Sequence, residues 1–183
     1  MPGEGEPFLY RNGEVGSQQT VNATKLTLQT KFDDLDTPYI PRSYNLSFSD
    51  SFSIFYPPLQ HPDYTAPSPP FAAISHPSNE TRISSSGLFN LESMYIGCEY
   101  NQSCLILVRG LSPPEDRLVA EVPVRVTPND ANWKFVNFSD FGFNQISSID
   151  FEVIDLETVD KGTLGLTLDQ IRYNEEVSVA QDC

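Results

Sequence analysis

Apolar and polar residues alternate along most of the chain, and this alternation is its dominant pattern. A period of two places successive side chains on opposite faces of an extended strand, so it predicts strands with one buried face. No long stretch repeats with the period of 3.6 residues that indicates an amphipathic helix. The alternating apolar positions form five groups: Leu26, Leu28 and Phe32; Phe48, Phe52, Ile54 and Tyr56; Val122, Val124 and Val126; Ile149, Phe151 and Val153; and Leu164, Leu166 and Leu168.

Proline and glycine signals between these groups predict turns and loops. Short strands separated by such turns are typical of an all-β protein, here an antiparallel two-sheet β-sandwich of the jelly-roll or immunoglobulin-like kind with about eight to ten strands. We expect one domain over residues 21–176, after a flexible N-terminal arm over 1–20 and before a C-terminal tail over 177–183. The turn signals include Tyr56–Pro58, Pro67–Pro70, Gly110–Pro114 and Thr127–Asp130.

Composition and charge exclude several classes of partner. The 183 residues include 25 acidic and 11 basic side chains, for a formal net charge of −14. Nucleic acids and anionic membrane surfaces are bound by clustered Lys and Arg, which this chain lacks. No run approaches the roughly 20 apolar residues of a membrane helix. We therefore expect a globular protein that binds neither nucleic acid nor membrane, and its oligomeric state stays open.

Five N-glycosylation sequons indicate a compartment. Only about two would arise by chance at this Asn, Ser and Thr content. Because such sites are used in secreted proteins, the enrichment predicts a secreted, extracellular glycoprotein. The alternative is that a Ser/Thr-rich surface produces sequons that are not used. Met1–Pro7 lacks the basic and apolar regions of a signal peptide, so a leader was removed or the gene product begins elsewhere. The acceptors are Asn22, Asn45, Asn79, Asn101 and Asn137.

The cysteine spacing predicts one disulfide. Cys98 and Cys104 lie between an aromatic-rich segment and the apolar run Leu105–Val108, which predicts a hairpin turn. A bond closing so short a loop would contribute about 2 kcal/mol, so we expect it to hold the hairpin rather than create the fold. Two reduced structural thiols are the alternative. Cys183 has no obvious intrachain partner, and it is either free or marks where a longer chain was cut.

Motifs for catalysis are scarce. There is no Gly-x-Ser-x-Gly motif and no zinc spacing, and the two histidines, His61 and His76, lie in Pro-rich sequence. Asp150 and Glu152 have the i, i+2 spacing that places two carboxylates on one face of a strand, and glycosidases of β-sandwich fold use two carboxylates on one sheet face at a defined separation. The simpler interpretation is the solvent-facing side of a strand. We therefore expect no enzymatic activity.

Recognition of carbohydrate needs only exposed aromatic rings with polar neighbours. Most aromatic side chains on strands belong to a core, so exposure is the deciding property. We expect Tyr64, in the proline-rich loop, and Tyr100, beside a sequon, to be the most exposed rings, with Trp133 as a further candidate. The full set of candidates is Tyr39, Tyr44, Tyr56, Tyr64, Tyr95, Tyr100 and Trp133.

Six short segments follow one another over about residues 25–175: Lys31–Leu35; Ile40–Tyr44 followed by Leu46 and Phe48; Ser68–Pro70; Gly87–Ser93; Leu107–Gly110; and Leu168–Asn174. Through their order the chain resembles a group of secreted fungal proteins with a single β-sandwich like a carbohydrate-binding module, mostly of unassigned function. It departs from that group at Phe71, where Asn is expected, and at Ser43, where Gly is expected.

The resemblance implies a jelly roll whose first and last core strands lie close together. Related sandwich modules often hold a structural calcium ion there, and calcium requires hard oxygen ligands. Asp33 or Asp34 with Asp169 would then supply the charged ligands. Asp33 and Asp34 point to opposite faces of a strand, so only one of them can join Asp169. The alternative is that these carboxylates cap strand ends or bind backbone N–H groups.

Three functions are compatible with these features of the sequence. The leading hypothesis is a secreted binding module that recognises a glycan or a cell-wall polysaccharide. The second is a structural or interaction protein of the cell surface that binds no glycan. The third is a small glycoside-active enzyme that uses Asp150 and Glu152.

Overall fold

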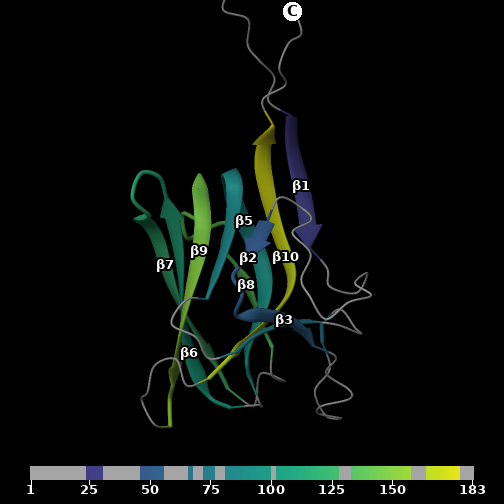
Figure 1. Cartoon of the computed structure of the whole chain (residues 1–183), viewed down its shortest axis with the longest axis vertical. Coiled ribbons are helices and arrows are strands. Elements are labelled where there is room, and N and C mark those ends of the chain that lie inside the picture. Colours follow the sequence, from purple (N-terminus) through teal and green to yellow (C-terminus); the bar gives the residue numbers. More distant parts are fainter. Residues whose placement is uncertain are drawn as a thin grey trace, which may run out of the picture.

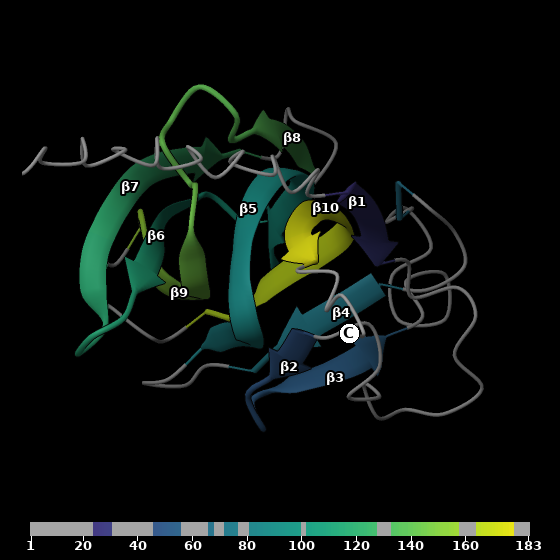
Figure 2. The same ribbon diagram turned by 90° about the horizontal axis from the view of Figure 1, so that it is seen from above.

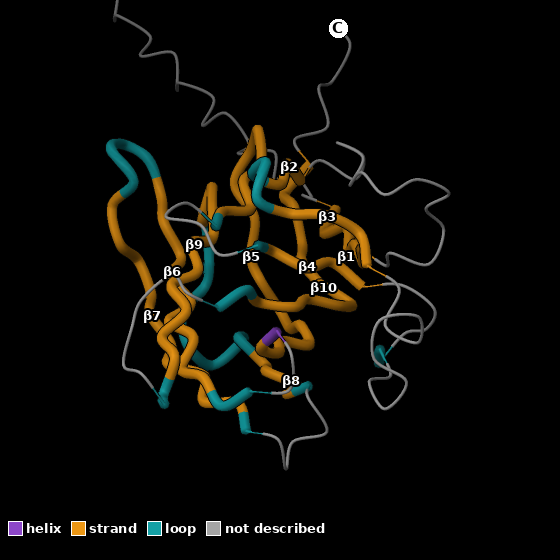
Figure 3. The backbone as a smooth tube through the Cα atoms, turned by 60° about the horizontal axis from the view of Figure 1, so that its bottom comes forward, coloured by secondary structure: helices purple, strands orange, loops and turns teal. Residues whose placement is uncertain are grey.

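The computed structural model describes residues 24–30, 46–55, 66–67, 72–76, 81–99, 102–127, 133–157 and 164–177. These residues form ten strands and almost no helix (Figure 3). The part of the chain that is described contains no helix long and apolar enough to cross a membrane. The strands are β1 (Thr24–Thr30), β2 (Leu46–Phe48), β3 (Phe52–Phe55), β4 (Ala72–Ser75), β5 (Arg82–Cys98), β6 (Cys104–Ser112), β7 (Arg117–Val126), β8 (Lys134–Asn137), β9 (Ile146–Asp155) and β10 (Leu166–Val177).

Hydrogen bonds join these strands in the order β3-β4-β10-β5-β9-β6-β7 (Figure 1). Three further strands lie beside this path, with β1 on β10 and both β2 and β8 on β5. Each pairing is antiparallel. The arrangement confirms the prediction of an all-β, antiparallel, sandwich-like domain.

The longest strand, β5, connects the two halves of the domain. Its N-terminal part pairs with β9 on one edge and with β2 on the other. Its C-terminal part pairs with β8 and β10, and the β9 register shifts between Ser84 and Phe89. Seen from above, β7, β6 and β9 lie on one side of β5, and β10, β4 and β3 lie on the other (Figure 2). The single strand therefore belongs to both halves.

The core lies between these halves and follows the predicted alternation. On β7, Val122, Val124 and Val126 are buried and the residues between them are exposed. The predicted apolar positions of β9 and β10 are buried in the same cluster, which also contains Phe89 and Tyr173 in edge-to-face contact at 5.9 Å. Burial of these apolar side chains is the main favourable contribution to folding. The pattern of the sequence thus predicts the inner face of the sheet.

The predicted disulfide between Cys98 and Cys104 is confirmed, with the two Cα atoms 6.2 Å apart and both residues buried. The predicted hairpin is wrong, because β5 and β6 are not hydrogen-bonded neighbours. Cys98 pairs in register with Leu166 of β10, and Cys104 pairs with Val126 and Asp155. The bond therefore links two parts of the sheet that no backbone ladder joins directly.

Removal of this covalent link should lower stability while leaving the fold intact. We expect the double variant Cys98→Ala/Cys104→Ala to lose about 2 kcal/mol of the free energy of unfolding, because the closed loop is short. Urea unfolding with and without reductant measures the loss. Reductant should destabilise the native chain and leave the double variant unchanged. Equal stability of the oxidised and reduced native chain would contradict the expectation.

Candidate functional site

An aromatic surface lies where β8 pairs with β5. Its two residues, Phe135 and Tyr95, are register partners, and their ring centroids are 5.2 Å apart. Phe135 is 55% exposed, and Tyr95 is half-buried beside it. The contact between the rings restricts the orientation of Phe135 although most of its surface faces solvent.

The core determines which face of β8 points outward. Val136 is buried, so its neighbours Phe135 and Asn137 face away from the core. Directly after the strand, Phe138 is fully buried, with its ring centroid 4.9 Å from that of Phe143. The backbone N–H of Phe138 also donates to the carbonyl of Glu92 at 2.7 Å. Buried residues on both sides of Asn137 therefore hold the outward-facing residues in place.

A small apolar cluster underlies the aromatic surface. Trp133 packs with Ala66, Ala72 and Ile74, and Tyr95 packs against this cluster. Trp133 is only 8% exposed. The expectation of an exposed sugar-binding ring is therefore not met at Trp133, because neighbouring side chains cover it. Its place in the structure is beneath Tyr95.

The other predicted rings, Tyr64 and Tyr100, lie outside the described residues. Phe135 lies outside the predicted set of rings, which contains only tyrosine and tryptophan residues. A signal was present in the sequence, since Phe135 and Asn137 alternate with the apolar residues Val136 and Phe138. Alternation places those two apolar residues inward and exposes Phe135.

Of the five predicted glycosylation sites, Asn137 is within the described residues and is exposed. Its Oδ1 accepts a hydrogen bond from the backbone N–H of Ser139, the third residue of the sequon, at 3.0 Å. The remaining acceptors, Asn22, Asn45, Asn79 and Asn101, lie outside the described residues, as does Cys183.

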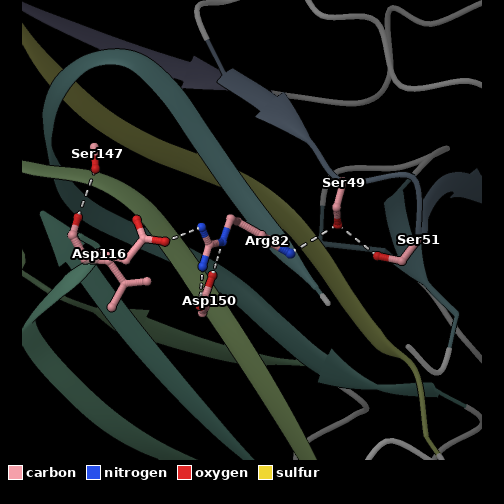
Figure 4. Close-up of polar contacts among 7 residues, drawn as sticks. Ser49, Ser51, Arg82, Asp116, Ser147 and Asp150 are labelled. Atoms are coloured by element: carbon pink, nitrogen blue, oxygen red, sulfur yellow. Dashed lines mark hydrogen bonds and ion pairs between the residues drawn. The ribbon is translucent and has the colours of Figure 1, made fainter. Parts of the chain in front are cut away.

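A second polar feature surrounds Arg82 at the start of β5 (Figure 4). Its guanidinium donates from Nε and Nη2 to both oxygens of Asp150, at 2.6 and 2.9 Å, and from Nη1 to Asp116 at 2.8 Å. These two carboxylates, Asp150 more than Asp116, raise the pKa of Arg82 above its ordinary value. The backbone N–H of Arg82 donates to Ser49 Oγ at 3.1 Å, and Ser49 Oγ lies 2.9 Å from Ser51 Oγ. The cluster joins β5, β9 and the turn before β7 with the segment between β2 and β3.

Arg109 of β6 makes a similar arrangement further along the same face. It donates to Glu121 of β7 at 2.6 Å and to Glu152 of β9 at 2.7 Å. Hydrogen bonds to Glu121 and then to Glu152 raise the pKa of Arg109. Asp150 and Glu152 therefore each accept hydrogen bonds from a different arginine. A glycosidase acid must donate a proton to its substrate, but both carboxylates here are engaged by arginine side chains. The geometry therefore favours the interpretation of Asp150 and Glu152 as solvent-facing strand positions.

The predicted calcium ligand Asp169 is fully buried in β10. Its Oδ1 accepts a hydrogen bond from the backbone N–H of Gln170 at 2.7 Å. Gln170 has a positive φ of 47°, and the pairing register with β5 shifts between Asp169 and Arg172. The carboxylate thus binds a backbone N–H group at an irregularity of the strand, as the alternative to calcium binding expects.

Calcium at this position stays a prediction. Asp33 and Asp34, the other proposed ligands, lie outside the described residues. Within the described ranges, no group of three or more His, Cys, Asp or Glu side chains is arranged to hold a metal ion.

Comparison with known proteins gives information on the fold. No protein-family model matches the chain. No curated protein gives a significant match. Among solved structures, the chain is similar to a DUF4465 family protein from Bacteroides caccae, with a TM-score of 0.53 and 11% sequence identity over 89% of this chain and 97% of that one. At this identity the likeness is one of fold, and it agrees with the all-β architecture.

Two further solved structures have lower TM-scores. One is an arabinose-bound GH51 α-L-arabinofuranosidase, with a TM-score of 0.48 and 13% identity over 78% of this chain and 25% of that one. The other is the K1 cleaved adhesin domain of Lys-gingipain from Porphyromonas gingivalis, with a TM-score of 0.49 and 11% identity over 84% of this chain and 99% of that one.

The Arg82 cluster should contribute to stability through charge. Arg82 and Asp150 are each about 30% exposed, so solvent screens their attraction. We expect Arg82→Gln to lower the free energy of unfolding by about 1 kcal/mol at low salt, and by less in 1 M salt, where charges are strongly screened. Thermal or urea unfolding at the two salt concentrations measures the difference.

The matched control is Arg125→Gln, which removes an exposed arginine from β7 of the same sheet. It should change stability by less than about 0.5 kcal/mol. A loss in Arg82→Gln no larger than that in Arg125→Gln would contradict the stabilising role of the cluster.

Proposed function

We propose that this protein is a secreted, non-enzymatic β-sandwich module that binds a glycan through the aromatic surface formed by Tyr95 and Phe135. The observation that carries the proposal is the exposed ring of Phe135, held against Tyr95 on a strand pair that is anchored in the core. Sugar rings present C–H groups on their faces, and an aromatic side chain offers a flat apolar surface of matching size. Little freedom is lost on binding, because the ring contact already restricts Phe135.

Charge favours a neutral ligand. The chain carries a net charge of −14, which repels polyanions at long range. Neutral polymers such as chitin, cellulose, β-glucan and mannan avoid this repulsion. We therefore assign the ligand to the neutral cell-wall polysaccharides or to glycans of the same chemistry.

A second candidate function is a structural or interaction protein of the cell surface without glycan binding. The burial of Trp133 favours it, since this large ring is unavailable to a ligand. The exposure of Phe135 favours the glycan-binding module. A glycoside-active enzyme has less support, because Asp150 and Glu152 are both engaged with arginine side chains.

Retention on insoluble polysaccharides tests the proposal. The purified chain, freed enzymatically of its own glycans, is mixed with chitin, cellulose, β-glucan and mannan, and the bound fraction is measured over a range of polymer concentrations. We expect retention on at least one polymer and a loss of about tenfold in affinity for Phe135→Ala, which corresponds to about 1.4 kcal/mol.

Leu118→Ala is the control variant, because Leu118 is 54% exposed but lies on β7, outside the aromatic surface. It should bind as the native chain does. Absence of retention on every polymer would favour the surface-structural function. Equal retention of the native and Phe135→Ala chains would remove the aromatic surface as the binding site.

A further inference from the structure

The outward face of β8 places a glycan acceptor next to an exposed ring. Phe135 and Asn137 are two residues apart on one strand, with the buried Val136 between them. Residues i and i+2 of a strand project from the same face, with Cα atoms about 7 Å apart. An N-linked sugar at Asn137 would therefore begin within reach of the ring of Phe135.

The acceptor is also held in a defined position. The backbone N–H of Ser139 donates to Asn137 Oδ1 at 3.0 Å, which fixes the amide group and leaves its Nδ2 as the attachment atom. Phe138, the middle residue of the sequon, is buried against Phe143. Ordered residues on both sides of Asn137 therefore restrict the direction in which its first sugar projects.

We propose that Asn137 carries an N-glycan whose first N-acetylglucosamine packs against the ring of Phe135. In the transfer, the bond from Asn137 Nδ2 to the sugar C1 forms and the bond from C1 to the pyrophosphate of a lipid-linked oligosaccharide donor breaks. The amide loses one proton, and the lipid pyrophosphate leaves. The C–H face of the attached sugar then covers apolar surface of Phe135, a residue that the protein itself leaves 55% exposed.

This modification goes beyond external glycan binding and does not require it. A further consequence rests on the proposed function. If the aromatic surface binds a polysaccharide, the attached sugar competes with that polysaccharide for the ring of Phe135. A tethered group has an effective concentration in the millimolar range, so the attached sugar would occupy the ring in preference to a weak external ligand. The glycan at Asn137 would then regulate access to Phe135.

A double-mutant cycle in the glycosylated chain tests the contact. Ser139→Ala removes the sequon but keeps Asn137 and the backbone N–H that donates to it, and Phe135→Ala removes the ring. The four proteins are expressed in a secretory eukaryotic host. Peptide mass spectrometry measures occupancy of Asn137, and thermal unfolding gives Tm. We expect Ser139→Ala to lower Tm by about 2–4 °C when Phe135 is present, and by much less in the Phe135→Ala chain.

Three controls separate the sugar contact from other effects. Ser139→Thr keeps the sequon and should retain both occupancy and Tm. Phe135→Tyr keeps an aromatic face and should retain the response to Ser139→Ala. The same four proteins made in bacteria, without N-glycans, should show no coupling between positions 135 and 139.

The contact is overturned if Asn137 of the native chain is unoccupied, or if Ser139→Ala lowers Tm equally with and without Phe135. Neither result depends on an external ligand. If no polysaccharide retains the chain but positions 135 and 139 are coupled, only the proposed function is rejected. If a polysaccharide retains the chain but the coupling is absent, only the attached-sugar contact is rejected.

Discussion

β5 is the element on which the rest of the domain depends, because four other strands form hydrogen bonds with it. Its two halves belong to different parts of the sheet, and the apolar side chains of both parts meet in one core. Each strand that pairs with β5 therefore has one inward face set by burial. Where the opposite face is open to solvent, as on β8, period two then turns every second residue outward, whereas Leu166–Asp169 of β10 are buried on both faces.

β8 illustrates how burial creates a site. Four residues long, it has little surface of its own, yet Val136 and the following Phe138 are anchored in the core. Phe135 and Asn137 face outward as a result, and pairing with β5 brings Tyr95 against Phe135. The ring proposed to contact sugar and the acceptor asparagine of a sequon thus share one face. On the other half of the sheet, charged side chains occupy the equivalent outward positions and are paired by Arg82 and Arg109.

Sequence patterns predict the features of this structure that depend on residues close together in the chain. Alternation gives the all-β class and the buried positions of β7, β9 and β10, and close spacing gives the disulfide. Features that depend on distant partners were missed. The hairpin at Cys98 was wrong because β5 pairs with strands remote in sequence, and the partner of Asp150 is Arg82, 68 residues away. Burial of Trp133 likewise depends on Ala72 and Ile74 of β4.

The glycan-binding function and the attached-sugar contact proposed here both require the ring of Phe135 to contact sugar. Nuclear Overhauser effects between the ring protons of 13C-labelled phenylalanine and sugar C–H protons test it most directly. They are measured in the glycosylated chain and in the deglycosylated chain with a soluble oligosaccharide of the retained polymer. We expect cross-peaks from Phe135 to the first N-acetylglucosamine in the glycosylated chain and to the added oligosaccharide in the deglycosylated chain. Phe135 ring protons with cross-peaks only to protein protons in both samples would contradict this expectation.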